Sequence, residues 1–301
     1  MTLMTSSTVD VSPTIRLHTM QAGALDAPPM VLLHGFPEYW AAWKDVIPLL
    51  AQDYRVIAPD LRGFNLSSKP EGARAYAAKH LVADILGLIK SQCGAVKPVL
   101  VAHDWGGAVA WNLAAQFPDA ISRLIIINSP HPFTFWRDLR SDPVQQAASA
   151  YMNWLRKPGC EVALAENNFE RLETFFLNMN GARWFDAQTR AEYHAAWGQP
   201  GALKGGCNYY RASPIHPPEE GALGAAGFTL DAAAFHVRIP TLVLWGEQDI
   251  ALPVKLIEGL EPMINDLTIK RFKDGSHWLL HEQPEAVAEA IRSWLLAKKR
   301  S

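Results

Sequence analysis

The chain has 301 residues, of which 49% are hydrophobic and 19% are charged. This composition is typical of a globular protein with a large core, and a net charge of −2 offers no basic surface to nucleic acid or anionic membranes. No apolar run approaches the roughly 20 residues that cross a bilayer, and residues 1–7 lack the basic start and apolar stretch of a signal peptide. We therefore expect a soluble, cytoplasmic protein without nucleic-acid or membrane partners.

The cysteines also indicate a cytoplasmic protein. Cys93, Cys160 and Cys207 are odd in number and widely spaced, which fits reduced thiols in a cytoplasm and no metal site. We interpret all three as core or surface filler.

The first part of the chain alternates between strand and helix patterns. A polar start, which we expect to be loose, precedes the first strand. Strands are predicted at 15–21, 30–33, 54–58, 98–103 and 124–127, and helices at 78–94 and 107–117. Such alternation predicts an α/β fold with a mostly parallel sheet covered by helices.

From Pro130 the pattern changes. The next hundred residues are rich in Trp, Phe, Asn and Ala at helical spacing, and they show no clear strand. Loops are predicted within this region at 201–206 and 214–227, where Gly and Pro accumulate. Alternation resumes at Val237 with strands at 240–246 and 267–271, and it ends in an amphipathic helix over 284–299. We predict a helical cap at 131–232 inserted into a core made of 1–130 and 233–301.

Residues 102–106, Ala-His-Asp-Trp-Gly, form a small-x-nucleophile-x-Gly pattern between a predicted strand and a predicted helix. Small residues at both ends of the pattern let the backbones approach, so that the central side chain projects into a cleft. Asp104 stands where Ser is usual. A carboxylate attacks as an anion and forms an ester when it displaces a leaving group at saturated carbon, and water must then hydrolyse that ester. An ordinary strand-to-helix turn is the alternative.

A second segment supports the catalytic interpretation. Residues 31–37, Val-Leu-Leu-His-Gly-Phe-Pro, follow the first apolar strand. The backbone amides of Phe36 and Trp105 are predicted to lie side by side, and two such donors form an oxyanion hole.

An acid and a histidine follow later strands. Asp249 ends one strand pattern and His277 lies just after the next, so the order nucleophile, acid, histidine is the one found with this turn. His277 is predicted to activate water while Asp249 fixes its tautomer. Glu247 and His281 are the alternatives for these two roles. Each candidate lies beyond the carboxyl end of a strand, where open α/β sheets bind ligands.

With these motifs the chain resembles the α/β-hydrolases, and among them the soluble epoxide hydrolases, with the haloalkane dehalogenases as close relatives. The resemblance runs from residue 34 to the last helix and includes the insertion. It implies two cap tyrosines that donate hydrogen bonds to the epoxide oxygen. Asn208-Tyr-Tyr-Arg211 matches the second cap motif and identifies Tyr210, and a Tyr seven residues before Pro158-Gly159 identifies Tyr151.

The resemblance implies hydrolysis of a small apolar epoxide to a vicinal diol through an alkyl ester on Asp104, which water activated by His277 then cleaves. Water is the second substrate, and no cofactor or metal is implied. We expect a monomer or a homodimer.

Two alternatives stay open. A haloalkane dehalogenase uses the same triad but cradles the halide with N–H donors, one from a Trp placed as Trp105 is. The second donor comes from an Asn at the Phe36 position, which is missing here, or from a cap Trp. The candidates in the cap are Trp154, Trp184 and Trp197. The alternative of another class is a non-catalytic binding protein on the same fold.

Overall fold

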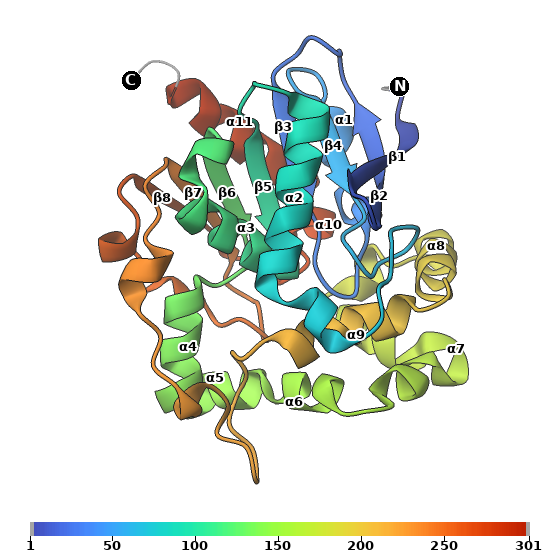
Figure 1. Cartoon of the computed structure of the whole chain (residues 1–301), viewed down its shortest axis with the longest axis vertical. Coiled ribbons are helices and arrows are strands. Elements are labelled where there is room, and N and C mark those ends of the chain that lie inside the picture. The colour runs from blue at the N-terminus through green and yellow to red at the C-terminus, as the bar shows by residue number, and fades with distance from the viewer. Residues whose placement is uncertain (1–2, 299–301) are drawn as a thin grey trace.

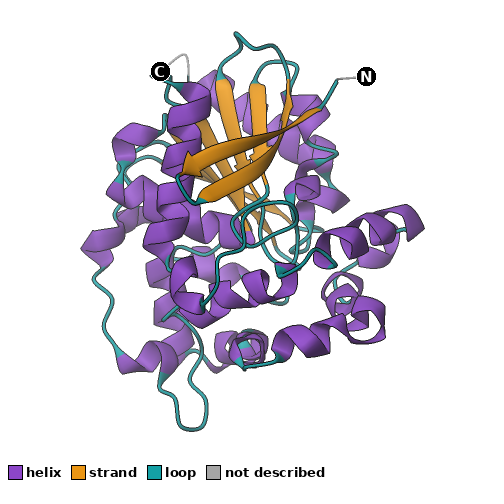
Figure 2. Ribbon diagram, turned by 45° about the vertical axis from the view of Figure 1, so that its right-hand side comes forward, coloured by secondary structure: helices purple, strands orange, loops and turns teal. Residues whose placement is uncertain are grey.

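The computed structural model describes residues 3–298 and is built around one eight-stranded sheet (Figure 2). The strands are β1 (Thr5–Ser12), β2 (Ile15–Ala22), β3 (Pro29–Leu33), β4 (Arg55–Pro59), β5 (Val99–His103), β6 (Arg123–Ile127), β7 (Thr241–Gly246) and β8 (Leu267–Phe272). Their order across the sheet is β1-β2-β4-β3-β5-β6-β7-β8. β2 pairs antiparallel with β1 and β4, and every other pair is parallel. The predicted mostly parallel α/β architecture is confirmed.

Helices cover both faces of this sheet. The core helices are α1 (Ile47–Leu50), α2 (Ala78–Cys93), α3 (Asp104–Gln116), α10 (Leu279–Glu282) and α11 (Pro284–Ala297). Alternate side chains of β3 explain the arrangement, since Val31 and Leu33 pack in the cluster that contains α2 and α3, whereas Met30 and Leu32 pack with α1 and α11. Central strands buried on both faces read as continuous apolar runs, which is why the sequence reveals them. Residue 299, the predicted end of the last helix, lies outside the described residues.

The insertion is helical, as the sequence predicts. Its helices are α4 (Pro132–Ser141), α5 (Pro143–Ala148), α6 (Ala150–Arg156), α7 (Cys160–Leu177), α8 (Ala187–Trp197) and α9 (Ala202–Ala212). In Figure 1 these green to gold helices lie below the sheet, at the end of the molecule opposite both termini. We call them the cap, whose exact boundaries at 131 and 232 stay a prediction. None of the helices within residues 3–298 combines the length and apolar character needed to cross a membrane.

The expectation of a loose N-terminal segment is wrong. β1 is an edge strand that pairs with β2 over its length, although only Val9 among its residues is buried. An exposed edge strand has no apolar face to show in the sequence, and backbone hydrogen bonds to β2 hold it in place. The polar composition of this strand therefore concealed it.

The expectation of a loop at 201–206 is also wrong. Gly201 has a φ of +80° and precedes α9, whose first turns include Gly205 and Gly206. A Cβ atom on Gly205 would collide with the backbone of Gly63, and one on Gly206 would lie 2.9 Å from the Phe36 ring. The glycines thus allow the cap and the core to approach closely, and they do not form a turn.

This packing gives a first prediction. Replacing Gly205 by Ala forces α9 away from the Gly63 backbone, and we expect a loss of about 2 kcal/mol in unfolding free energy. Urea denaturation monitored by Trp fluorescence measures it. Lys204→Ala is the matched control on the exposed face of the same helix and should change stability little. Equal stability of Gly205→Ala and the wild-type protein would contradict the proposed backbone contact.

Candidate active site

The turn between β5 and α3 places Asp104 in a strained conformation. Asp104 has a φ of +49°, and α3 begins at this residue, three positions earlier than the sequence pattern suggests. The neighbouring backbone leaves no space for side chains: a Cβ on Gly106 would lie 2.5 Å from the His34 carbonyl oxygen, and one on Gly35 would overlap the Asp104 side chain. The Ser129 hydroxyl donates a hydrogen bond of 2.6 Å to the Asp104 carbonyl oxygen. Surrounding contacts therefore hold the strain at one partly buried carboxylate.

One of the two predicted oxyanion donors already contacts this carboxylate. The Phe36 backbone N–H donates to Asp104 Oδ1 at 2.7 Å. The Trp105 amide stays a prediction for this role. The Trp105 ring lines the cavity above Asp104 and packs edge-on against Tyr210, with the ring centroids 5.0 Å apart.

The structure brings the other two triad candidates to Asp104. His277 Nδ1 lies 2.7 Å from Asp249 Oδ2, and His277 Nε2 lies 3.7 Å from Asp104 Oδ2. Asp249 thus fixes the proton on Nδ1 and leaves Nε2 turned toward the nucleophile candidate. Glu247, the alternative acid, instead forms an ion pair with Arg271.

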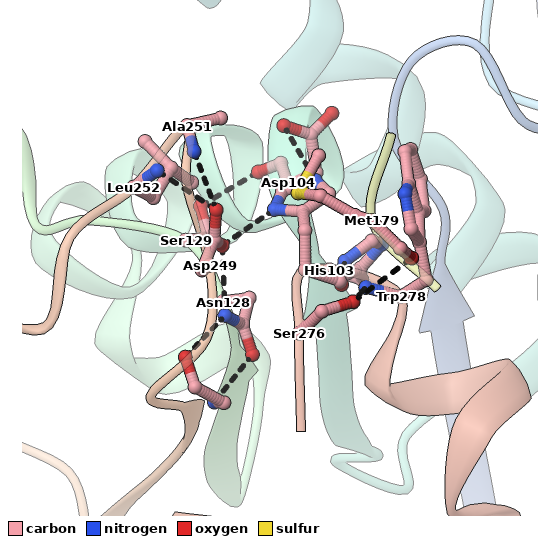
Figure 3. A network of polar contacts seen from close by, with 12 residues as sticks. His103, Asp104, Asn128, Ser129, Met179, Asp249, Ala251, Leu252, Ser276 and Trp278 are labelled. Carbon is pink, nitrogen blue, oxygen red and sulfur yellow. Dashed lines mark hydrogen bonds and ion pairs between the residues drawn. The ribbon is translucent and has the colours of Figure 1, made fainter. Parts of the chain in front are cut away.

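Asn128 is a site residue that sequence reasoning missed. Its side-chain amide donates to Asp249 Oδ2 at 2.8 Å and accepts from the Gly246 backbone at 2.9 Å (Figure 3). The backbone amides of Ala251 and Leu252 donate to the other oxygen of Asp249. Asn128 follows β6 at the carboxyl edge of the sheet and has a φ of +40°. A polar residue at the carboxyl edge of the sheet was the available signal for Asn128 in the sequence.

The electrostatic balance at His277 favours the charged ring. Burial opposes ionisation, but the charge and hydrogen bond of Asp249 and the charges of Asp104 and Glu38 raise the pKa of His277 to about 9. Removing the charge of Asp104 therefore lowers this pKa, since one of the raising causes disappears.

A second buried carboxylate lies behind the triad. Glu38 is 1% exposed, and its Oε1 lies 2.6 Å from His281 Nε2 and accepts from the Tyr193 hydroxyl at 2.9 Å. Its Oε2 lies 3.3 Å from His103 Nδ1. The other ring nitrogen of His103 lies 2.9 Å from the His277 carbonyl oxygen. His281, the alternative histidine, is thus engaged with Glu38.

The two cap tyrosines lie over the nucleophile candidate. Tyr151 from α6 and Tyr210 from α9 have ring centroids 6.1 Å apart, and both line a cavity of about 210 Å³ together with Asp104. Burial raises the pKa of both hydroxyls, and the negative charge of Asp104 raises each further. Both phenols therefore stay protonated at neutral pH, so each carries a proton that it can donate. Tyr209, in contrast, donates its hydroxyl to the Arg62 carbonyl oxygen at 2.8 Å.

The three cap tryptophans do not line this cavity among the described residues. The Trp197 indole donates to the Pro37 carbonyl oxygen at 2.6 Å. Trp184 stacks on His281 with the ring centroids 3.9 Å apart, and Trp154 lies against Arg171. The remaining wall is mostly apolar, and its apolar residues come largely from α2, α3, α4 and the segment after α9. It includes Leu81, Val109, Phe135, Ile215, Leu230 and Phe235.

Comparison with known proteins identifies the fold family of this chain. Residues 28–284 match the model of the alpha/beta hydrolase fold family. The chain is 38% identical to AB hydrolase superfamily protein YfhM of Bacillus subtilis over 93% of its own length and 94% of that protein. It is 33% identical to epoxide hydrolase 4 of Mus musculus, covering 95% of this chain and 78% of the mouse protein.

Solved structures of epoxide hydrolases are also similar to this chain. An epoxide hydrolase of Bacillus megaterium in complex with an inhibitor is similar with a TM-score of 0.85 and 31% identity, covering 96% of this chain and 99% of that one. A structure described among novel epoxide hydrolases from metagenomes of hot environments has a TM-score of 0.85 and 36% identity, covering 97% and 98%. The chain belongs to the α/β-hydrolase fold family, and its relatives include epoxide hydrolases over nearly its full length.

The raised pKa of His277 predicts a pH-dependent stability. A group whose folded-state pKa is raised stabilises the fold fully below its ordinary pKa of 6.5, and this contribution is lost as pH rises through about 9. We expect the stability difference between the wild-type protein and His277→Gln to shrink by about 3 kcal/mol or less between pH 6.5 and 9.5. Urea titrations across this range measure it.

His131 provides the control, because burial lowers its pKa to about 4. The stability difference between the wild-type protein and His131→Gln should therefore stay constant above pH 6.5. A constant difference for His277→Gln as well would show that the folded protein does not hold His277 as an imidazolium.

Proposed function

We propose that this protein hydrolyses apolar epoxides to vicinal diols through an alkyl ester on Asp104. The observation that carries the proposal is the placement of two protonated tyrosines, Tyr151 and Tyr210, in the cavity that contains the Asp104 carboxylate. A nucleophile on one side and proton donors on the other are what ring opening of an epoxide needs. The epoxide hydrolases among the relatives support the same reaction.

The first step forms the ester. Asp104 Oδ2 attacks an epoxide carbon, the ring C–O bond breaks, and the alkoxide takes a proton from Tyr151 or Tyr210. The Phe36 amide keeps Oδ1 in place, so that Oδ1 becomes the carbonyl oxygen of the ester. A protonated donor is needed because an alkoxide is a very poor leaving group at neutral pH.

The second step cleaves the ester. Alkylation removes the charge of Asp104, which lowers the pKa of His277 and prepares Nε2 to accept a proton. Water attacks the ester carbonyl carbon while His277 takes its proton, and the Phe36 amide stabilises the oxyanion on Oδ1. The tetrahedral intermediate then expels the diol oxygen, which takes the proton from His277. The carboxylic acid that forms gives its proton to the tyrosinate left by the first step, so the Asp104 carboxylate and the phenol are both restored.

The same observations favour an epoxide over a haloalkane. A halide leaves without a proton, and its site needs N–H donors around the leaving group. In this chain the Phe36 side chain has no N–H to donate. The three cap tryptophans are not among the residues that line the described cavity. A non-catalytic binding protein has no need of a strained carboxylate aimed at a buried His–Asp pair. We also propose the predicted cytoplasmic location and a monomer or homodimer.

The two-step scheme predicts different failures for two variants. Asp104→Asn, which tolerates the positive φ, should lose diol formation by at least a thousandfold because no ester forms. His277→Gln should consume about one equivalent of epoxide in a burst and then stop, because only ester hydrolysis needs the base. Rapid-quench kinetics and mass spectrometry of the peptide containing residue 104 measure both.

Circular dichroism and thermal unfolding confirm that each variant is folded. The scheme is wrong if folded Asp104→Asn retains more than a few per cent of activity. His281→Gln is the comparison for His277→Gln. If the covalent adduct accumulated in His281→Gln and not in His277→Gln, His281 would be the base instead of His277.

Removing the cap hydroxyls tests the proton donors. Tyr210→Phe and Tyr151→Phe should each slow alkylation by about 2–4 kcal/mol in activation free energy, by analogy with a single oxyanion-hole donor, and the double variant should lose more. Ester hydrolysis should change little. Stopped-flow measurements with styrene oxide and with a 1-haloalkane separate the two steps and the two substrate classes.

Tyr209→Phe is the matched control, since this hydroxyl is committed to the Arg62 carbonyl oxygen. Its alkylation rate should stay close to that of the wild-type protein. Parental epoxide opening by the double variant, or haloalkane turnover that exceeds epoxide turnover, would reject the epoxide hydrolase proposal.

A further inference from the structure

Two cysteines that are far apart in the sequence meet in the cap. Cys160 begins α7 and Cys207 lies in the middle of α9, and their Sγ atoms are 3.0 Å apart. Both are free thiols, and both are buried. The sequence suggested three unrelated cysteines, but the packing of α7 against α9 makes two of them a pair. Cys93 at the end of α2 has no part in this contact.

The surroundings make the two sulfur atoms chemically different. The Arg211 guanidinium lies 3.3 Å from Cys160 Sγ and also pairs with Glu161. The Cys207 thiol and the charge of Arg211 lower the pKa of Cys160 against the effect of burial, whereas the contact with Cys160 and burial raise the pKa of Cys207. Two sulfur atoms at contact distance, one of them with a lowered pKa that favours its reactive thiolate form, are the arrangement that disulfide chemistry uses.

A metal ion is the competing ligand for this cluster. Cys160, Glu161 and Cys207 place one donor atom each within 4.8 Å of one another. However, Arg211 contacts both Cys160 and Glu161, so its positive charge already occupies the position that a cation needs. Charge repulsion therefore disfavours a metal and leaves the thiol pair.

We propose that Cys160 and Cys207 form an oxidative modification site that a hydroperoxide converts to a disulfide. The Cys160 thiolate attacks one oxygen of hydrogen peroxide, the O–O bond breaks, and with uptake of a proton the products are Cys160 sulfenic acid and water. The Cys207 sulfur then attacks the sulfenic sulfur and its proton leaves with the hydroxyl as a second water. Two thiols are oxidised and one peroxide is reduced.

The position of the pair connects this modification to the cap. Cys207 lies three residues before Tyr210 in α9, so the new bond would anchor the helix one turn from that tyrosine. The bond also closes a loop between residues 47 positions apart. The Arg211 and Glu161 side chains contact Cys160 and are 15% and 22% exposed, so they lie between the thiol and solvent.

Peptide mapping of the oxidised protein tests the proposal without any use of epoxide turnover. The intact protein is treated with a few equivalents of hydrogen peroxide under native conditions, quenched, alkylated and digested without reductant. We expect a peptide pair linked through Cys160 and Cys207 and lighter by two hydrogen atoms, which dithiothreitol separates. Oxidation should raise Tm by about 5 °C, as expected for closing a loop of this length.

Single substitutions of the cysteines and of Arg211 give the controls. Cys93→Ser should form the linked peptide and gain the same Tm shift, whereas Cys160→Ser and Cys207→Ser should show neither. Arg211→Gln should slow formation of the linked peptide several-fold, because it removes the positive charge beside Cys160. Cys160→Ala serves if the serine variant does not fold.

Several results would overturn the proposal. They are sulfinic acid at Cys160 without a linked peptide, a linked peptide that involves Cys93, or a link that appears only in denaturant. Stoichiometric binding of Zn²⁺ that Cys207→Ser abolishes would assign the cluster to a metal instead. Loss of diol formation in any variant has no bearing on these outcomes.

Discussion

The close approach of two strand ends around Asp104 is the constraint on which the site depends. β3 and β5 are hydrogen-bonded neighbours, so the turns that follow them are forced together at the carboxyl edge of the sheet. Glycine at positions 35 and 106 allows the contact, and the Phe36 amide then faces the Asp104 carboxylate at 2.7 Å. The strain of a positive φ at Asp104 is maintained by the sheet, which does not relax without breaking its own ladder.

The buried carboxylates near Asp104 are each paired with hydrogen-bonding partners. Asp249 accepts from His277, Asn128 and two backbone amides, which satisfies a carboxylate that is only 4% exposed. Glu38 is surrounded in a similar way by His281, His103 and Tyr193. These hydrogen-bonding partners lower the cost of burying the two carboxylates, and Asp104 is the carboxylate that faces the described cavity.

The cap completes the site through one close contact. α9 packs on the core at Gly205 and Gly206, and this contact carries Tyr210 to the edge of the Trp105 and Phe36 rings. The same helix brings Cys207 to α7. The proposed proton donor Tyr210, the glycines that contact the core and one thiol of the pair, Cys207, therefore share a single helix. A change in how α9 sits on the core affects all three together, because a helix moves as a unit.

The sequence by itself determined the order of strands β2 to β8, the inserted helical region and the residues proposed as nucleophile, acid and base, and its resemblance to epoxide hydrolases identified the proposed cap donors. Those features rest on local patterns: apolar runs, a small-x-Asp-x-Gly turn and short motifs. Only the tertiary structure decided that β1 is an edge strand and that Gly205 lies within a helix. It also decided that Asn128 bonds Asp249, that Glu38 lies beside His103 and His281, and that Cys160 meets Cys207. Each of these depends on contacts between residues far apart in the chain, and such contacts leave no periodicity in the sequence.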